Sequence, residues 1–404
     1  MKSKLTNKQY AVPFILITSL FFLWGFARAI LDVLNQHFRD TLDISITESS
    51  LIQVTTYMGY FLMAIPAGMF INRYGYKRGV VFGLLLYAIG AFLFIPSCNI
   101  GTLGAFLVCL FIIACGLAIL ETAANPYATE LGDKETSAAR LNFAQSFNGL
   151  GSCLAPALIG GFLFAGGENA DVSVPYMVMG IVVVIVAIVF SFSKLPEIKH
   201  EEQEASTESH PLSTLLKNKL FLFGAGALLA YEVAEISINS YFVLYTTGQN
   251  LLTPATASVV LSVALMFFMV GRFIGSWVMQ KISAERTLYF CATGTVICMI
   301  GVVLTSLITT DSTSWMQYIP LVFLLANYIF EAIMFPTIFS LAIKGLGNCT
   351  KTASSILMMT PVGGCAFLLV GFVADHAGFV IPFLIPLAGY AVVWAYAKRK
   401  CRQN

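Results

Sequence analysis

Two carboxylates stand in stretches of the sequence that are otherwise apolar. Glu121 follows a run from Gly104 to Leu120 that contains only apolar and small residues and two cysteines, and Asp32 lies in the first apolar stretch of the chain. An ionisable side chain within a membrane span costs roughly 3 kcal/mol to insert, so it usually faces a protein interior or a water-filled path. Such a carboxylate can take up a proton or accept a hydrogen bond from a hydroxylated ligand. We therefore interpret Glu121 and Asp32 as functional residues.

A cation and an amide accompany Asp32. Arg28, Asp32 and Asn35 follow one another at steps of four and three residues, which places them on one face of a helix. One interpretation is an internal Arg28–Asp32 ion pair that neutralises itself. The other is that Arg28 adjusts the affinity of Asp32 for protons while the three side chains contact a ligand. Both interpretations stay open, and Arg28 and Asn35 are candidate ligand-binding residues.

A row of amides follows Glu121 along the chain. Asn125 lies one helical turn beyond Glu121, and Pro126 next to it removes a backbone hydrogen bond and can kink the helix. The following stretch carries polar residues at steps of three and four, which share one helix face: they are Asn142, Gln145, Asn148 and Ser152. A carboxylate opposite a row of amides could bind a hydroxylated ligand, so Asn125, Gln145 and Asn148 are candidate binding residues.

The second half of the chain carries similar groups. Glu235 and Asn239 lie four residues apart in one apolar stretch, and Asn327 and Glu331 lie four apart in another. Each pair could contact a ligand or could form hydrogen bonds between helices within the membrane. All four are candidate binding residues. Arg272, between Gly271 and Gly275, is instead expected to be a structural arginine at a tight helix crossing.

The elements that position these residues are membrane helices. The chain has 404 residues, of which 58% are hydrophobic and 11% charged, whereas a soluble domain has roughly 25% charged residues. Twelve apolar stretches approach or exceed the 20 or so residues that a helix needs to cross the hydrocarbon core: 13–36, 51–71, 79–97, 101–130, 141–165, 174–193, 220–245, 255–280, 288–309, 315–343, 354–374 and 379–397. The sequence therefore predicts an all-α membrane protein with 12 transmembrane helices.

Basic residues predict the orientation of these spans. If the N-terminus is cytoplasmic, all but three of the 23 Lys and Arg residues fall on the cytoplasmic side, as the positive-inside rule requires. The exceptions are Arg39 in an outer loop and Arg28 and Arg272 within spans. We expect a multi-pass protein of the cell inner (plasma) membrane with both termini in the cytoplasm.

The two halves of the chain resemble each other. A shift of 210 residues places Glu121 on Glu331 and Pro126 on Pro336, and three further matches at nearby shifts, among them Gly68 on Gly275 at 207, keep the same order along the two halves. A polar stretch, 195–218, separates the halves. We expect two six-helix bundles related by pseudo-two-fold symmetry, 1–194 and 219–404, joined by a cytoplasmic linker loop, 195–218. This is the architecture of the major facilitator transporters, whose substrate site lies between the repeats.

Several classes of partner and cofactor are not supported by the sequence. The nine cysteines are scattered without a CxxC pair or a His/Cys cluster, so we assign neither a metal nor a disulfide. The composition does not support nucleic-acid binding. We expect a small-molecule substrate and membrane lipid as partners, a monomer, and no cofactor other than H⁺ as coupling ion.

Longer segments carry a family resemblance. LFFLWGFARAILDVLNQHF, GLAILETAANPYATELG, ARLNFAQSFNGLG and FPTIFSLAIKGLG resemble the fucose–proton symporter family of the major facilitator superfamily, which includes glucose/galactose transporters. The loop after the second span resembles the superfamily's GxxxDRxGRR/K signature, with Asn72 where the family has Asp.

The resemblance implies roles for individual residues. It implies that Asp32 and Glu121 serve proton coupling and sugar recognition, that Gln145 and Asn148 are the polar residues of the fifth span, and that Glu235 contacts sugar. Arg28 departs from the family pattern, in which neutral residues precede the first-span Asp. This departure leaves open an acidic sugar whose carboxylate meets Arg28.

The sequence thus predicts a proton-coupled importer of a monosaccharide, a hexose or deoxyhexose such as glucose, galactose or fucose, that works by alternating access. A uniporter, a sodium-coupled carrier and a carrier of an acidic or modified sugar remain alternatives. An enzyme acting on lipid-linked sugars is disfavoured because the sequence lacks a nucleophile motif, paired carboxylates on a long periplasmic loop and a metal cluster. A sugar sensor that does not transport is a further alternative, although the sequence lacks an appended signalling domain.

Overall fold

The fold is helical. The structure is a computed structural model, and it describes residues 8–132, 137–165, 171–193, 215–279, 281–308, 315–346, 349, 353 and 356–403. Every regular element in these ranges is a helix. Twelve helical segments are long and apolar enough to cross a membrane. The predicted all-α architecture with 12 spans is confirmed.

The chain divides into two compact units. Unit 1 comprises Met1–Ile44 and Leu51–Gln203, and unit 2 comprises Ser45–Ser50 and Glu204–Asn404. The six residues Ser45–Ser50 thus lie within the range 1–194 of the first expected bundle but cluster with unit 2. Of the expected linker, 195–218, only 215–218 are among the described residues.

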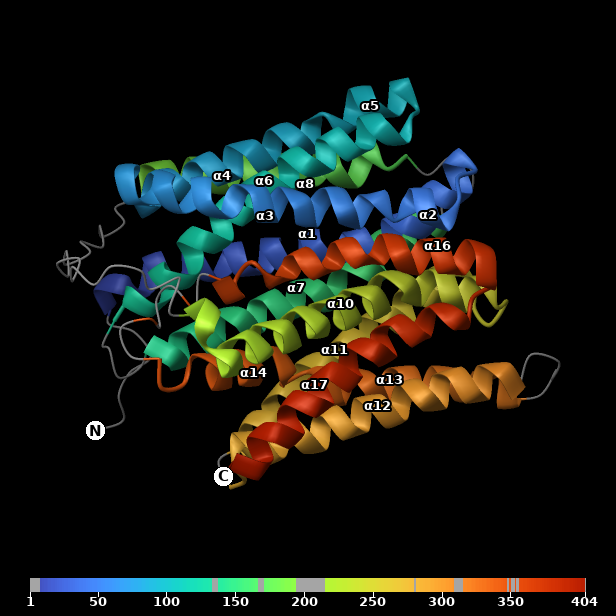
Figure 1. The fold of residues 1–404 in the computed structure, drawn as a ribbon. Helices are drawn as coiled ribbons and strands as arrows, with labels where there is room; N and C mark the ends of the chain where they lie inside the picture. Colours follow the sequence, from blue (N-terminus) through green and yellow to red (C-terminus); the bar gives the residue numbers. More distant parts are fainter. Residues whose placement is uncertain are drawn as a thin grey trace. The chain divides into compact units, whose positions relative to one another are not determined.

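Unit 1 contains the first six spans. Its helices are α1 (Ala11–Leu42), α3 (Leu51–Tyr74), α4 (Tyr76–Phe92), α5 (Phe94–Ile100), α6 (Leu103–Glu130), α7 (Ser137–Ala165) and α8 (Ser173–Phe192), after the short 3₁₀ turn η1 (Lys8–Tyr10). The third span, Tyr76–Ile100, is formed by α4 and α5 together. Figure 1 shows α4, α6 and α8 running side by side, with α3 against α6.

Glycine makes the tight turn between α3 and α4. Gly75 has a φ of +86°, a conformation that L side chains rarely adopt. It lies between the last residue of α3, Tyr74, and the first residue of α4, Tyr76. The turn therefore explains why glycine occupies position 75 of this loop, because the chain reverses direction there within one residue.

Small residues allow α1 and α7 to pack closely. A Cβ at Gly25 would lie 2.1 Å from the Asn148 carbonyl oxygen, and a Cβ at Gly151 would lie 2.3 Å from the Phe22 carbonyl oxygen. The amide of Asn148 donates to the Phe21 carbonyl (3.2 Å), and the Ser152 hydroxyl donates to the Gly25 carbonyl (3.2 Å). Small residues and interhelical hydrogen bonds are the usual means of holding membrane helices together.

Unit 2 contains the other six spans. Its helices are α2 (Ile46–Ser49), α10 (Lys219–Gly248), α11 (Pro254–Val278), α12 (Ala284–Ile308), α13 (Ile319–Glu331), α14 (Met334–Ile343), α16 (Phe367–Ala377) and α17 (Leu384–Gln403), with 3₁₀ turns η4 (Trp315–Tyr318), η6 (Thr360–Ala366) and η7 (Ile381–Phe383). Side-chain caps start two of them: Asn218 accepts from Leu220 N and Phe221 N at α10, and Thr253 accepts from Thr256 N at α11. In Figure 1, α12 and α13 lie alongside each other.

The tenth span is interrupted between α13 and α14. Pro336 cannot donate to the carbonyl of Ala332, four residues earlier, and the helix breaks at that point. Arg272 Nε donates to this carbonyl instead (3.2 Å), while its guanidinium carbon lies 4.6 Å from the centroid of the Phe268 ring. The flanking Gly271 packs against Ile329, whose carbonyl oxygen would lie 2.7 Å from a Cβ at the glycine. Arg272 is therefore structural, as the sequence suggested, because it satisfies a carbonyl that the proline leaves free.

The short helix α2 docks on α16. Asp375 of α16 accepts hydrogen bonds from the backbone N–H groups of Ile46 (3.1 Å) and Thr47 (2.8 Å) and from the Thr47 hydroxyl (2.6 Å). Gly371, one turn earlier, leaves room for Ser50, whose hydroxyl oxygen would lie 2.2 Å from a Cβ at this position. A carboxylate at a helix start satisfies N–H groups that have no partner within the helix.

Replacing Asp375 by alanine is expected to loosen α2. Each lost hydrogen bond is worth about 0.5–1.5 kcal/mol net, so the amides of Ile46 and Thr47 should exchange with solvent about tenfold faster. Hydrogen exchange read by mass spectrometry on the purified chain would measure this change. Asp375→Asn is the matched control, because its side-chain oxygen still accepts, and it should show a smaller effect. Unchanged exchange in the alanine variant would show that Asp375 does not hold α2.

Candidate functional site

Glu121 lies on α6 as a half-buried carboxylate. It stands within the span Leu103–Ala128, and its side chain is partly exposed. The Glu121 carboxylate and the guanidinium of Arg28, on α1, interact electrostatically. The two helices pack against each other within unit 1. The structure therefore brings together a carboxylate and a cation that the sequence places 93 residues apart.

Two tyrosine hydroxyls on α3 interact with the Glu121–Arg28 pair. Arg28 Nε donates to the Tyr57 hydroxyl (3.3 Å), and its guanidinium carbon lies 5.7 Å from the centroid of the Tyr57 ring. The Tyr60 hydroxyl, one turn further along α3, accepts from Trp24 Nε1 (2.9 Å) and interacts electrostatically with Glu121 and Arg28. Helices α1, α3 and α6 thus contribute a carboxylate, a guanidinium, two phenols and an indole to one region of unit 1.

The other two α1 candidates differ in exposure. Asp32 lies one turn beyond Arg28 and is half-buried. Asn35 is fully buried, and its amide donates to the Leu31 carbonyl of the same helix (3.4 Å). Its side-chain oxygen Oδ1 is buried without a hydrogen-bond partner in the described part of the chain. Of the two, only Asp32 keeps exposed surface in this structure.

The amides of α6 and α7 meet beside Glu121. Gln145 Nε2 donates to Asn125 Oδ1 (3.3 Å), and both residues are half-buried. Asn148, one turn beyond Gln145, uses its amide nitrogen in the bond to the Phe21 carbonyl. The Gln145–Asn125 pair therefore presents adjustable amides near the carboxylate, whereas the Asn148 amide nitrogen helps to hold α7 against α1.

The four candidates of unit 2 also differ in their exposure. Glu235 on α10 is half-buried, while Asn239 on the same helix is nearly buried and its Oδ1 has no partner in the described residues. Asn327 and Glu331 on α13 have no exposed surface, and Asn327 Nδ2 donates to Glu331 Oε2 (2.8 Å). Glu235 interacts electrostatically with Glu331. Glu235 is thus the most exposed of the four candidates of unit 2.

The two repeat-related glutamates therefore have different surroundings. Glu121 is partly exposed and faces Arg28, whereas Glu331 is fully buried and hydrogen-bonded to Asn327 and Tyr390. A carboxyl group that exchanges protons with water needs accessible surface, and of the two glutamates only Glu121 keeps some in this structure. The two repeats thus carry glutamate at the same position but in different environments.

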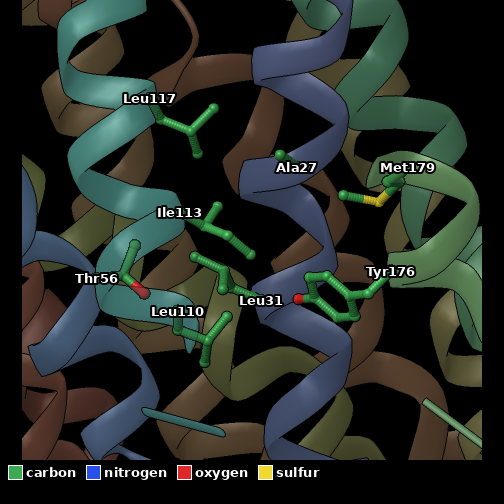
Figure 2. A pocket seen from close by; sticks show the side chains of 8 residues that line it. All are labelled: Ala27, Leu31, Thr56, Leu110, Ile113, Leu117, Tyr176 and Met179. Carbon is green, nitrogen blue, oxygen red and sulfur yellow. The ribbon is translucent and has the colours of Figure 1, made fainter. Parts of the chain in front are cut away.

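A crevice in unit 1 lies elsewhere and is apolar. Figure 2 shows its lining, which comes from α1, α3, α6 and α8: Ala27, Leu31, Thr56, Leu110, Ile113, Leu117, Tyr176 and Met179. The hydroxyl of Thr56 donates to the Ile52 carbonyl of its own helix (2.8 Å). The space holds about one water molecule, so it is too small for a sugar.

The chain matches a known protein family. The model of the Major Facilitator Superfamily matches residues 17–369, which is most of the chain. The chain belongs to this superfamily. With its twelve spans it is a multi-pass membrane protein, as is expected of a transporter of this superfamily.

Individual superfamily members are similar over nearly the full length. The glucose/galactose transporter of Brucella abortus (strain 9-941) is 34% identical over 97% of this chain and 94% of its own. The L-fucose-proton symporter of Escherichia coli (strain K12) is 32% identical over 97% of this chain and 94% of its own. The crystal structure of the transporter FucP in the outward conformation superposes with a TM-score of 0.70 at 32% identity, covering 97% of this chain and 99% of FucP. The resemblance to the fucose–proton symporter family is confirmed.

Two residues of these clusters were not singled out from the sequence. Tyr60 carries no charge, although its spacing of three from Tyr57 places both phenols on one helix face. Tyr390 lies in an apolar stretch of the twelfth span, and no pattern in the sequence connects it to Glu331.

Proposed function

We propose that this chain is a proton-coupled monosaccharide importer that works by alternating access. The observation that carries the proposal is the half-buried Glu121 carboxylate of unit 1, which interacts with Arg28 beside Tyr57, Tyr60 and the Gln145–Asn125 pair. Carboxylates, amides and phenols are the groups that hydrogen-bond sugar hydroxyls. The similarity to a glucose/galactose transporter and to L-fucose-proton symporters supports a sugar as substrate and H⁺ as coupling ion.

The mechanism depends on charge neutralisation. When the site is open outward, a proton binds a carboxylate of the Asp32/Glu121 pair and sugar hydroxyls bind the amides and carboxylates. Neutralising the carboxylate lowers the free energy needed to enclose it away from water. The two repeats then change orientation so that the site opens inward, and sugar and proton leave. Arg28 interacts with Glu121, so it favours release of that proton once the site is open to the cytoplasm.

Transport into vesicles tests the proposal. The purified full chain in liposomes should accumulate sugar when a proton gradient alone is imposed, and a sodium gradient alone should have no effect. Accumulation under a sodium gradient would instead identify a sodium-coupled carrier, and equilibration without accumulation a uniporter. Chemical conversion of a lipid-linked sugar without translocation would identify an enzyme, and binding without translocation a sensor.

Arg28 is the residue most suited to decide between neutral and acidic sugars. Its guanidinium donates through Nε to the Tyr57 hydroxyl, and a guanidinium binds a carboxylate with two parallel hydrogen bonds. If the substrate is neutral, Arg28→Ala should weaken stabilisation by hexoses by roughly 10- to 150-fold in sugar concentration, which corresponds to the loss of about one hydrogen bond to a charged group, about 1.5–3 kcal/mol. Thermal-shift measurements with neutral and acidic monosaccharides would check this. Stabilisation by uronic acids that Arg28→Ala abolishes would instead identify an acidic substrate.

The proposal includes the place and orientation of the chain. We propose the cell inner membrane as its location, with both termini in the cytoplasm, because nearly all Lys and Arg residues outside the spans then lie on the cytoplasmic side. We also propose that it acts as a monomer and is not an enzyme.

A further inference from the structure

The buried polar cluster of unit 2 consists of three side chains from two helices. Glu331 Oε2 accepts hydrogen bonds from Asn327 Nδ2 (2.8 Å) and from the hydroxyl of Tyr390, on α17. Asn327 Nδ2 also lies 3.2 Å from the Tyr390 hydroxyl, so that the three groups form a closed ring. All three residues have no exposed surface. The ring ties the last residue of α13 to the middle of α17.

The other carboxyl oxygen of Glu331 is not compensated. Glu331 Oε1 is buried without a hydrogen-bond partner in the part of the chain that the structure describes. An ionised carboxylate distributes its charge over both oxygens, and burying it with one oxygen bare is costly unless a cation neutralises it. In the acid form Oε1 carries the proton, and the group that is buried has no net charge.

Within the described residues, the ionisable groups around Glu331 do not supply a cation. Those that interact with it electrostatically are acidic or neutral in character: Glu235 and Tyr231 of α10, Cys298 of α12 and Tyr390 of α17. Arg272 of α11 interacts with Tyr231, and its Nε is used by the Ala332 carbonyl at the break that follows α13. Glu235 adds negative charge, which further disfavours a second carboxylate.

We propose that Glu331 is a permanently neutral carboxylic acid that positions α13 against α17, next to the interruption of the tenth span, and is not one of the ligand-binding residues expected from the sequence, because it has no exposed surface. The exchangeable proton of the transport cycle then belongs to unit 1, and this second statement rests on the proposed function. The two repeat-related glutamates then have different roles: Glu121, which is partly exposed and interacts electrostatically with Arg28, changes protonation, and Glu331, which is enclosed by Asn327 and Tyr390, does not.

If Glu331 is always protonated, glutamine should be the substitution at this position that affects transport least. Glu331→Gln keeps the size of the side chain and a neutral group whose oxygen can still accept from Asn327 and Tyr390. Proton-driven sugar accumulation in this variant should stay within about twofold of the wild type. Glu331→Ala leaves the Asn327 amide and the Tyr390 hydroxyl without their buried acceptor, so its melting temperature should fall.

Infrared spectroscopy of the purified full chain tests the protonation state directly. The difference spectrum between wild type and Glu331→Gln should contain the C=O stretch of a protonated carboxylic acid, and this band should not change over the pH range in which the protein stays folded. A purely packing role for an ionised Glu331 would not give such a band. In Tyr390→Phe the band should remain and shift in frequency, because one donor to the acid is lost.

Three results would overturn the proposal. They are a carboxylate band in place of the acid band, an acid band that titrates, and a folded Glu331→Gln protein that no longer accumulates sugar. If Glu331→Gln does not fold, the difference spectrum between wild type and Tyr390→Phe replaces it. The absence of a shifted acid band in that spectrum would also contradict the proposal. Failure of wild-type protein to accumulate sugar under a proton gradient would overturn the proposed function and leave the infrared result standing.

Discussion

Glu121→Gln is expected to abolish proton-driven accumulation of sugar while retaining sugar binding or exchange. Glutamine cannot release a proton, so the variant remains in the state that the wild type reaches only after protonation. A membrane potential contributes about 2.3 kcal/mol per charge per 100 mV, which corresponds to roughly 50-fold accumulation at 100 mV. In liposomes with an imposed proton gradient, the ratio of internal to external sugar should fall from tens to one.

Two comparisons make this prediction specific. Counterflow, in which labelled sugar exchanges for unlabelled sugar without a gradient, should persist in Glu121→Gln. Glu48→Gln is the matched control, because Glu48 is exposed in the capping box of α2, where glutamine serves equally well. Accumulation at the wild-type level in Glu121→Gln would remove this residue from proton coupling.

Gly151→Ala is expected to destabilise unit 1 strongly, although it adds a single methyl group. The new Cβ would lie 2.3 Å from the Phe22 carbonyl oxygen and 2.9 Å from the Phe26 nitrogen, and both are backbone atoms of α1 that cannot rotate away. Forcing an extra group into a packed interface costs about 1–3 kcal/mol or more. At about 2–4 °C per kcal/mol for a unit of this size, the melting temperature of the purified protein should fall by several degrees.

The same helix offers a matched control for this change. Gly161 also lies in α7, and a Cβ there would have no neighbouring atom within 4 Å. Gly161→Ala should leave the melting temperature nearly unchanged, since surface substitutions usually alter stability by about 0.5 kcal/mol or less. Equal melting temperatures for the two variants would show that α1 and α7 do not pack as closely as the structure indicates.

The two glutamates show how a duplicated sequence can diverge in function without changing residue type. Glu121 and Glu331 align in the repeat, and each is followed five residues later by proline. Helix α6 continues through Pro126, whereas the tenth span breaks before Pro336. The glutamate in the continuous helix keeps partly exposed surface, and the one at the break is fully buried and accepts a hydrogen bond from a tyrosine of another helix.

Much of the architecture follows from the order of residues along the chain. Hydropathy over windows of about 20 residues predicts the twelve spans, because a membrane helix satisfies its own backbone and needs only apolar side chains. The repeat of Glu121 and Pro126 at Glu331 and Pro336 predicts the duplication, and motifs such as LETAANP place the chain in its family. Charges within spans single out Glu121, Arg28 and Asp32, since such charges are costly wherever they occur.

Which of these polar groups meet, and which reach water, depends on helix rotation and packing. Spacing in the sequence places Asn35 and Asp32 on one face of α1, yet Asn35 is fully buried and Asp32 is not. The partnerships of Glu121 with Arg28, of Gln145 with Asn125 and of Glu331 with Tyr390 join residues 20 to 93 positions apart. Periodicity reports the face of one helix, whereas burial and hydrogen bonding depend on what the neighbouring helices place against that face.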